Sequence, residues 1–257
     1  MTIIRQIMLI LCFVFIIPPA KATDEPIIAA AANIKFALDD IAKSFTTDTG
    51  NKVRISYGSS GNFVAQIKHG APFELFLSAD SRYIEQLQQD NIIADDGVLY
   101  AIGKLALVSP KNAKWALDPE LIGLKKALAE GEISRFAIAN PEHAPYGDSA
   151  KSLLIKQHLW QSIEPHLIYG ENVSQAAQFA LSGSTQGGII ALSLALAPQF
   201  KARSSYLELP ANAYKPLAQR MVLLPKAGKT AADFFHYLQS KQAKMIFKQY
   251  GFGLPQG

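Results

Sequence analysis

The sequence predicts an α/β fold of two lobes, each a mainly parallel sheet flanked by helices. The chain has 257 residues, 49% of them hydrophobic, which is enough to bury a sizeable core and favours two lobes over one. Short apolar runs that suit strands alternate with stretches in which apolar residues recur at helical spacing. Such alternation is typical of α/β proteins with parallel sheets.

The N-terminal segment predicts export. Arg5 precedes an apolar run of eleven residues, 7–17, and the small-x-small sequence 20–22 follows it. This order is typical of a secretory signal, so we expect residues 1–22 to be a signal peptide cleaved after Ala22 and the mature protein to be periplasmic. A membrane anchor is the alternative, but a span needs roughly 20 apolar residues.

The mature chain is expected to be nearly neutral and without thiols. Residues 1–22 contain Arg5, Lys21 and Cys12, so their removal leaves 23 basic and 21 acidic residues and lowers the net charge from +4 to +2. The sequence contains no cluster of Lys and Arg with interleaved aromatic residues, so no nucleic-acid partner is predicted. Without a cysteine the mature chain has no disulfide, and its stability has to come from packing.

Strand and helix candidates alternate through the first half. The apolar run 27–32 predicts a strand, and Asn33 is expected to cap the helix that follows. A strand at 53–57 leads through a Ser/Gly turn into a helix at 62–67, which Gly70 ends. Then we expect a strand at 75–77, a helix at 81–89 and a strand at 105–108.

The same alternation returns in the second half. We expect, in order, a strand at 136–139, a helix at 149–160, a strand at 166–169, a helix at 174–181 and strands at 188–192 and 221–224. The C-terminal stretch 231–250 has the spacing of a helix with an apolar face and a lysine-rich face.

Four strand-to-helix junctions carry small or polar residues that suit an anion. They are Asn33, 59–61, 146–147 and 172–174. A helix start leaves N–H groups unpaired and carries the positive end of the helix dipole. In parallel sheets these starts lie outside the carboxyl ends of the strands, where ligands bind. Two junctions belong to the first hundred residues and two to the middle hundred, so a ligand that touches all four would lie between two lobes.

The residues around these junctions also have simpler explanations. A Ser/Gly turn and an Asn often only cap a helix, and Val173 offers nothing but its N–H. No Lys or Arg lies in the junctions, which favours neutral donors around a dehydrated oxyanion. Asp148 and Glu171 flank the site, and a carboxylate about 4 Å from an anion costs about 4 kcal/mol at a dielectric near 20. We therefore expect both to face solvent or to cap helices.

Enzyme motifs are incomplete. The five histidines lack metal-ligand spacing, residues 59–60 do not fit a nucleophile elbow, and Leu223 stands where a phosphate loop ending at 228–230 needs its first glycine. No cofactor, metal or reaction is predicted. Two alternatives stay open: an exported serine hydrolase using Ser60 with His143, and a receptor of the same fold for another small anion or an organic acid. His143 is near enough to Tyr146 in the sequence to reach the cleft mouth, but an ordinary loop histidine is the favoured interpretation.

Nine sequence blocks carry a family resemblance. They are 29–33 (AAAAN), 57–63 (YGSSGNF), 66–67 (QI) with 70–72 (GAP), 77–80 (LSAD), 100–107 (YAIGKLAL), 139–141 (ANP), 144–147 (APYG), 172–176 (NVSQA) and 248–252 (KQYGF). In this order they resemble the periplasmic molybdate-binding proteins over nearly the whole mature chain. The resemblance implies a type II periplasmic binding protein that binds molybdate or tungstate as a monomer and delivers it to the permease of an inner-membrane ABC transporter. Lobe 1 is then expected at 23–102 and 218–257, and lobe 2 at 103–217.

The resemblance also implies site residues. Asn33 matches a ligand-contacting residue, Ser60 a serine donor, Tyr146 the residue after Ala-Pro in the third loop and Val173 a backbone donor. Ala32 matches a site where some members have Thr or Ser. Because a hydroxyl is missing there, either Asn33 or the backbone compensates, or affinity and specificity differ.

Overall fold

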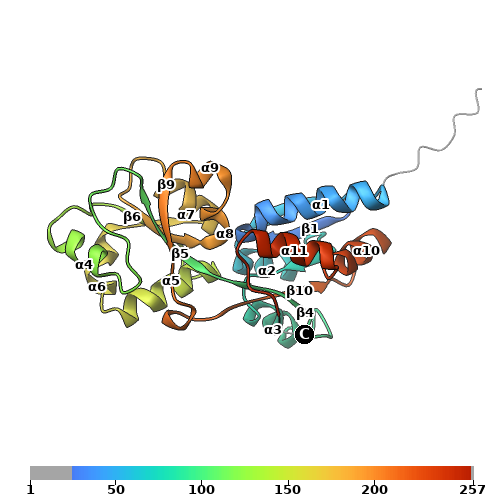
Figure 1. Ribbon diagram of the computed structural model, residues 1–257. Helices are drawn as coiled ribbons and strands as arrows, with labels where there is room; N and C mark the ends of the chain where they lie inside the picture. Colours follow the sequence, from blue (N-terminus) through green and yellow to red (C-terminus); the bar gives the residue numbers. More distant parts are fainter. Residues whose placement is uncertain (1–24, 256–257) are drawn as a thin grey trace, which may run out of the picture.

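Two five-stranded sheets, each covered by helices, form the two lobes that lie side by side in Figure 1. The structure is a computed structural model and describes residues 25–255. The expected signal peptide, residues 1–22, lies outside the described residues. The two-lobed α/β architecture is confirmed.

The sheet of the first lobe has the strand order β2-β1-β3-β10-β4. Its strands are β1 (Ile27–Ala31), β2 (Arg54–Gly58), β3 (Leu75–Leu77), β4 (Val98–Gly103) and β10 (Leu217–Leu223). The first three are parallel, whereas β10 runs antiparallel to β3 and β4. Its helices are α1 (Lys35–Thr49), α2 (Ser60–Lys68), α3 (Arg82–Gln89), α10 (Lys229–Tyr237) and α11 (Lys241–Gln249), with the 3-10 helix η1 (Ala32–Ile34) between β1 and α1.

The second lobe repeats this topology with the order β7-β6-β8-β5-β9. Its strands are β5 (Leu105–Pro110), β6 (Phe136–Ala139), β7 (Leu167–Gly170), β8 (Gly188–Ala191) and β9 (Ser204–Glu208). Here β6 is parallel to β7 and β8, and β5 runs antiparallel to β8 and β9. The helices are α4 (Ile122–Ala129), α5 (Pro145–Lys156), α6 (Trp160–Ile163), α7 (Val173–Ala180), α8 (Leu192–Ala195) and α9 (Pro198–Lys201), with the 3-10 helices η2 (Glu164–His166) and η3 (Ala211–Ala213).

Both sheets are therefore mixed, because one strand of each comes from a chain crossover. Strand β4 of the first lobe continues almost directly into β5 of the second, and the chain returns from β9 to β10. The four strand ends that precede η1, α2, α5 and α7 belong to the parallel part of each sheet.

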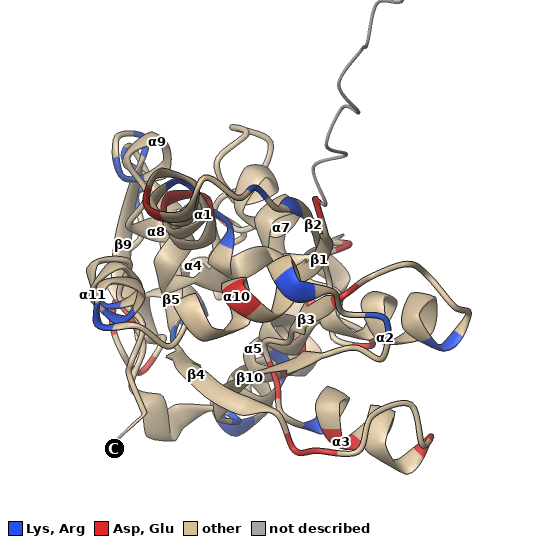
Figure 2. Cartoon of the chain, turned by 90° about the vertical axis from the view of Figure 1, so that its right-hand side faces the viewer, with Lys and Arg blue, Asp and Glu red and all other residues tan. Residues whose placement is uncertain are grey.

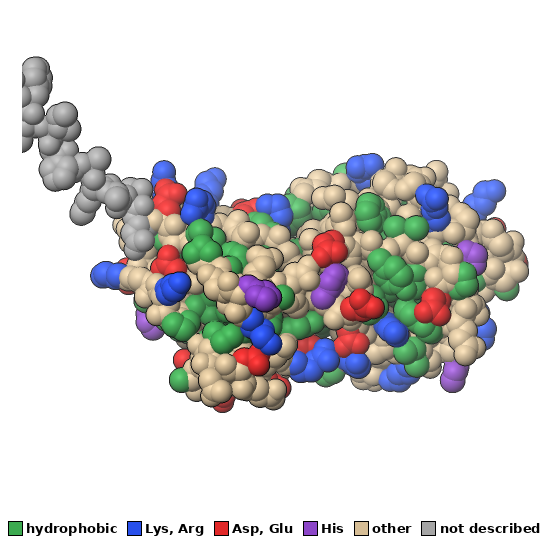
Figure 3. Space-filling view, turned by 180° about the vertical axis from the view of Figure 1, so that it is seen from behind, with side chains coloured by type: hydrophobic (Ala, Val, Ile, Leu, Met, Phe, Trp, Pro, Cys, Tyr) green, Lys and Arg blue, Asp and Glu red, His purple; other side chains and the backbone are tan. Residues whose placement is uncertain are grey.

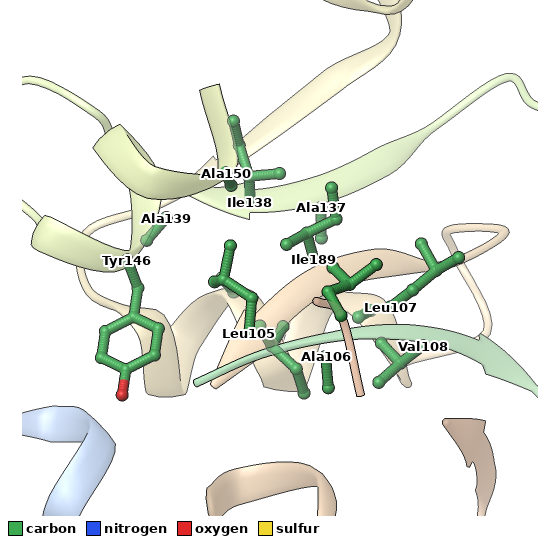
Figure 4. Packing of buried hydrophobic residues seen from close by; sticks show 14 of the residues in the cluster. Leu105, Ala106, Leu107, Val108, Ala137, Ile138, Ala139, Tyr146, Ala150 and Ile189 are labelled. Atoms are coloured by element: carbon green, nitrogen blue, oxygen red, sulfur yellow. The ribbon is translucent and has the colours of Figure 1, made fainter. Parts of the chain in front are cut away.

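Apolar strands covered on both faces make the cores. Strands β3 and β6 are fully buried and contain only apolar residues, as expected for parallel strands between helices. Strands β1, β3 and β4 carry no charged residue, and charged residues lie on the surrounding helices and loops in Figure 2. In the second lobe, side chains of β5, β6 and α5 interlock in a single cluster (Figure 4).

Three expectations about the helices are wrong in detail. Asn33 does not cap a helix: it lies inside η1, and α1 begins at Lys35. Helix α5 begins at Pro145 rather than at 149, because proline suits the first turn of a helix. The C-terminal stretch is two helices, since Ser240 caps α11 by accepting a bond from the Ala243 N–H at 3.1 Å.

Strands β4 and β9 and helix α4 were not expected from the pattern.

None of the helices in residues 25–255 has both the length and the hydrophobicity that crossing a bilayer requires.

Candidate ligand site between the lobes

A small pocket lies between the lobes, where strands β1, β2, β6 and β7 end. All five residues of the predicted site lie on its wall: Ala32 and Asn33 after β1, Ser60 after β2, Tyr146 after β6 and Val173 after β7. The complete lining is Ala31, Ala32, Asn33, Gly58, Ser59, Ser60, Ala79, Ala144, Pro145, Tyr146, Asn172 and Val173. The four junctions singled out in the sequence therefore converge on one space.

Three main-chain amides at this cavity are free to donate. The N–H groups of Ser60, Tyr146 and Val173 lie in the first turns of α2, α5 and α7, and no acceptor in the described part of the chain takes them. In α7 the side chain of Asn172 caps the next two amides, with its Oδ1 accepting from Ser174 at 3.0 Å and Gln175 at 3.1 Å. This cap leaves the first amide, that of Val173, available to a ligand.

Two buried serine hydroxyls add to these donors. The Ser60 Oγ accepts a bond from the Ala79 N–H at 3.0 Å, which leaves the Ser60 O–H free to donate. Ser59 occupies the cap position of α2 but makes no cap bond, and its buried Oγ has no partner among residues 25–255. The predicted site included Ser60 and not Ser59; the structure gives Ser59 an equally unused hydroxyl.

The Asn33 side chain belongs to a buried hydrogen-bond network with Tyr146, Gln219 and Tyr100. The Asn33 Nδ2 donates to the Tyr146 hydroxyl at 3.2 Å and to the Gln219 Oε1 at 3.0 Å. The Gln219 Nε2 donates to the same hydroxyl at 3.1 Å, and the Tyr100 hydroxyl donates to the Gln219 Oε1 at 2.9 Å. Tyr146 thus reaches out of the second lobe, and in Figure 4 its hydroxyl ends beside a ribbon of the first lobe.

Sequence reasoning missed Gln219 and Tyr100. Gln219 lies two positions before the strand expected at 221–224, so the pattern did not mark it as buried, although strand β10 begins at Leu217 and buries it. Nothing in the pattern says which residues its side chain binds.

The site is neutral. Burial raises the pKa of Tyr146 well above its ordinary value, and nearby Tyr214 raises it further, although the bonds from Gln219 and Asn33 partly oppose this. Burial likewise raises the pKa of Tyr100. Both hydroxyls therefore keep their protons at physiological pH. No Lys, Arg, Asp or Glu lines the cavity.

The two lobes are in contact around the cavity. The Ser174 hydroxyl donates to the Ala32 carbonyl at 2.9 Å, and the Ser193 hydroxyl donates to the Asn33 carbonyl at 2.7 Å. The Gly61 N–H donates to the His143 carbonyl at 2.9 Å. A Cβ at Gly61 would lie 2.8 Å from that carbonyl oxygen, so the close approach needs glycine.

The carboxylates beside the site behave differently from each other. Asp148 was expected to face solvent or cap a helix, and this is wrong: its carboxylate binds Arg82 Nη2 and Lys215 Nζ, each at 2.8 Å. Burial alone would raise the pKa of Asp148, but the bonds from Lys215 and Arg82 outweigh it and lower the pKa. Glu171 does face solvent and contacts Asn62 and the His143 Nε2. Figure 3 shows acidic, basic and histidine side chains close together near the middle of the molecule.

The residues of the hydrolase alternative are not joined. His143 lies at the lobe boundary, but within the described residues no hydrogen bond links it to Ser60. Its Nε2 lies 3.3 Å from the Glu171 Oε1. Ser60 therefore has no base in this arrangement.

Comparison with known proteins gives the family. The profile described as bacterial extracellular solute-binding protein matches residues 27–253. A molybdate-binding protein of Rhodobacter capsulatus is 35% identical over 234 residues, covering 90% of this chain and 89% of that protein. One of Azotobacter vinelandii is 35% identical over 239 residues, covering 91% and 92%.

The fold agrees with this assignment. The solved structure of the Azotobacter vinelandii periplasmic molybdate-binding protein matches with a TM-score of 0.80 and 31% identity, covering 90% of this chain and 100% of that one. The chain therefore belongs to the bacterial extracellular solute-binding proteins and, among them, groups with the molybdate-binding proteins.

Proposed function

We propose that the protein is a periplasmic receptor that binds molybdate or tungstate and delivers the oxyanion to the permease of an ABC transporter in the inner membrane. The observation that carries this is the set of neutral donors from both lobes that converge on one small, buried cavity without a charged side chain. Two relatives that are 35% identical over most of their length are named molybdate-binding proteins, which supports this choice of anion.

The ligand residues of this proposal are Asn33, Ser60, Tyr146 and Val173, with Ala32 on the wall. Val173 and Tyr146 contribute main-chain N–H groups, and Ser60 contributes its hydroxyl and its N–H. These rigid groups hold the anion by hydrogen bonds alone. Hydrogen bonds to a charged acceptor are worth about 1.5 to 3 kcal/mol each.

The Ser59 hydroxyl can replace the hydroxyl that Ala32 lacks. A hydroxyl is missing at Ala32, while Ser59, on the same wall, keeps a buried hydroxyl that no other group uses. We propose that Ser59 supplies this donor. The alternative compensations at this position, by Asn33 or the backbone, leave the Ser59 hydroxyl without a role.

Binding is coupled to closure of the lobes. The ligand contacts come from both lobes, so the anion stabilises the closed arrangement over an open one. We propose that the lobes, 23–102 with 218–257 and 103–217, move about the two crossovers, and that the receptor works as a monomer without catalysing a reaction. The fixed spacing of rigid donors then selects the anion by size.

Titration calorimetry with molybdate, tungstate, sulfate, phosphate and a small dicarboxylate tests the proposal. We expect saturable binding of molybdate and tungstate, one anion per protein, and much weaker binding of the other three. Sulfate binding as tight as that of molybdate would contradict a site selected by size. Tight dicarboxylate binding without molybdate binding would favour the organic-acid receptor instead.

A further inference from the structure

Gln219 is a fully buried amide in β10 that does not line the cavity but contacts the residues that do. Its Oε1 accepts bonds from Asn33 and Tyr100, and its Nε2 donates to Tyr146. Asn33 belongs to the first lobe and Tyr146 to the second. One side chain therefore connects the cavity wall with the contact between the lobes.

Among the described residues, the hydrogen bonds of this network leave two groups unpaired, the Asn33 Oδ1 and the Tyr146 O–H proton. The Tyr146 hydroxyl oxygen accepts bonds from both amides, those of Asn33 and Gln219. The Asn33 Oδ1 is buried and has no partner among the described residues. A carbonyl oxygen on the wall of the cavity repels an oxyanion, and an unpaired buried acceptor is itself unfavourable.

A rotation of two amides removes this conflict. The two ends of an amide have the same shape, so turning Asn33 and Gln219 by 180° exchanges donors and acceptors without moving the backbone. The Gln219 Nε2 then donates to the Asn33 Oδ1 and to the Tyr100 hydroxyl oxygen. The Tyr100 O–H in turn donates a hydrogen bond to the Ser78 carbonyl, 3.3 Å away. The Tyr146 hydroxyl donates to the Gln219 Oε1. Within the network only the Asn33 Nδ2 is then left without a partner, and it is free to bind an anion.

We propose that Gln219 is a positioning residue that sets which end of the Asn33 amide faces the ligand and that, through Tyr146, ties this choice to contact between the lobes. The inference rests on the proposed function, because only an anion needs a donor at this point. The anion selects the arrangement in which the Asn33 Nδ2 faces it. The same arrangement makes Tyr146 of the second lobe a donor to Gln219 of the first.

Two variants of Gln219 separate positioning from packing. Gln219→Glu keeps the shape but ends in two acceptors, which draw the Asn33 Nδ2 away from the ligand, so the Kd for molybdate should rise about a hundredfold. Gln219→Met keeps the length of the side chain but makes no hydrogen bond that fixes which end of the Asn33 amide faces the ligand. The Kd should therefore rise about tenfold. Gln66→Glu, on the exposed face of α2, adds the same charge away from the network and should bind like the parent.

Calorimetry and thermal unfolding are measured on each variant. A role in packing alone predicts that affinity follows the unfolding temperature. Positioning predicts that Gln219→Glu binds more weakly than Gln219→Met whatever the order of their unfolding temperatures. Binding by both variants within twofold of the parent overturns the proposal.

A second measurement uses the unaltered protein and so does not depend on how the variants fold. In the 15N-labelled protein the side-chain NH₂ signals of Asn33 and Gln219 are identified by their absence from Asn33→Asp and Gln219→Glu. Saturating molybdate should shift both pairs and leave that of Gln66 unchanged. Binding in calorimetry without these shifts overturns this inference alone, whereas no binding of molybdate or tungstate overturns the proposed function and this inference with it.

Discussion

Arg82 of the first lobe binds Asp148 of the second, with Nη2 and Oδ2 2.8 Å apart. Arg82 lies in α3 and also contacts Asp80, and Asp148 lies in the first turn of α5, next to the cavity. Lys215, which precedes β10, binds the same carboxylate. This cluster lies outside the cavity, so it contributes to contact between the lobes without placing a charge on the ligand.

Asp148→Asn should therefore speed ligand release. The ion pair is partly exposed, with 56% of the Arg82 side chain accessible, and such pairs contribute about 0.5 to 1 kcal/mol, or about two- to fivefold in rate. Stopped-flow measurement of molybdate dissociation tests this. Asp233→Asn removes a carboxylate that pairs with Lys229 inside α10, and this control should release molybdate at the parental rate. An unchanged rate for Asp148→Asn would show that the pair does not hold the lobes.

The same pair should make stability depend on pH. Because Lys215 and Arg82 lower the pKa of Asp148 despite its burial, its contribution to the free energy of unfolding is present above the ordinary carboxyl pKa. It is lost as pH falls through the lowered value in the folded protein. Thermal unfolding of the parent and Asp148→Asn should differ at pH 7, and the difference should shrink below about pH 4. A difference that stays constant down to pH 3 would contradict this.

The two serines of the cavity should respond differently to alanine. Ser60→Ala removes a ligand donor and also leaves the buried Ala79 N–H without its acceptor, so both affinity and unfolding temperature should fall. Ser59→Ala removes a hydroxyl that no residue between 25 and 255 uses, so affinity alone should fall. Each loss of affinity should be about 1.5 to 3 kcal/mol.

Calorimetry and thermal unfolding measure these two effects separately. Ser205→Ala, at an exposed position of β9, should change neither quantity. Parental affinity in Ser59→Ala would remove Ser59 from the site, and parental affinity in Ser60→Ala would do the same for Ser60.

The sequence predicts the strands better than it predicts the use of side chains. The strands at 75–77 and 136–139 are found at the residues expected, because a strand buried on both faces is a continuous apolar run between turn residues. Asn33 shows the limit. Its position after a strand suggests a helix cap, but its side chain binds Gln219, which is 186 positions further along the chain.

Partners at such distances leave no local pattern. Ser59 makes a similar point at short range, since a serine before a helix usually caps it and only the folded chain shows that this hydroxyl is unused. The convergence of four helix starts could be predicted because it depends on topology. The orientation of each donor could not, because it depends on contacts that form only after folding.

Gly61 limits how closely the lobes approach, and its replacement should separate closure from folding. In Gly61→Ala the new Cβ would lie 2.8 Å from the His143 carbonyl oxygen, which is backbone and cannot turn aside. The lobes then cannot form the bond from the Gly61 N–H to His143 or close fully over the cavity. Helix α2 should keep its stability or gain a little, because alanine suits a helix better than glycine. Small-angle scattering with saturating molybdate should show a smaller radius of gyration for the parent than for Gly61→Ala, and calorimetry should show weaker binding by the variant. A variant that binds molybdate as tightly as the parent would mean that the lobe contact at Gly61 does not contribute to holding the ligand.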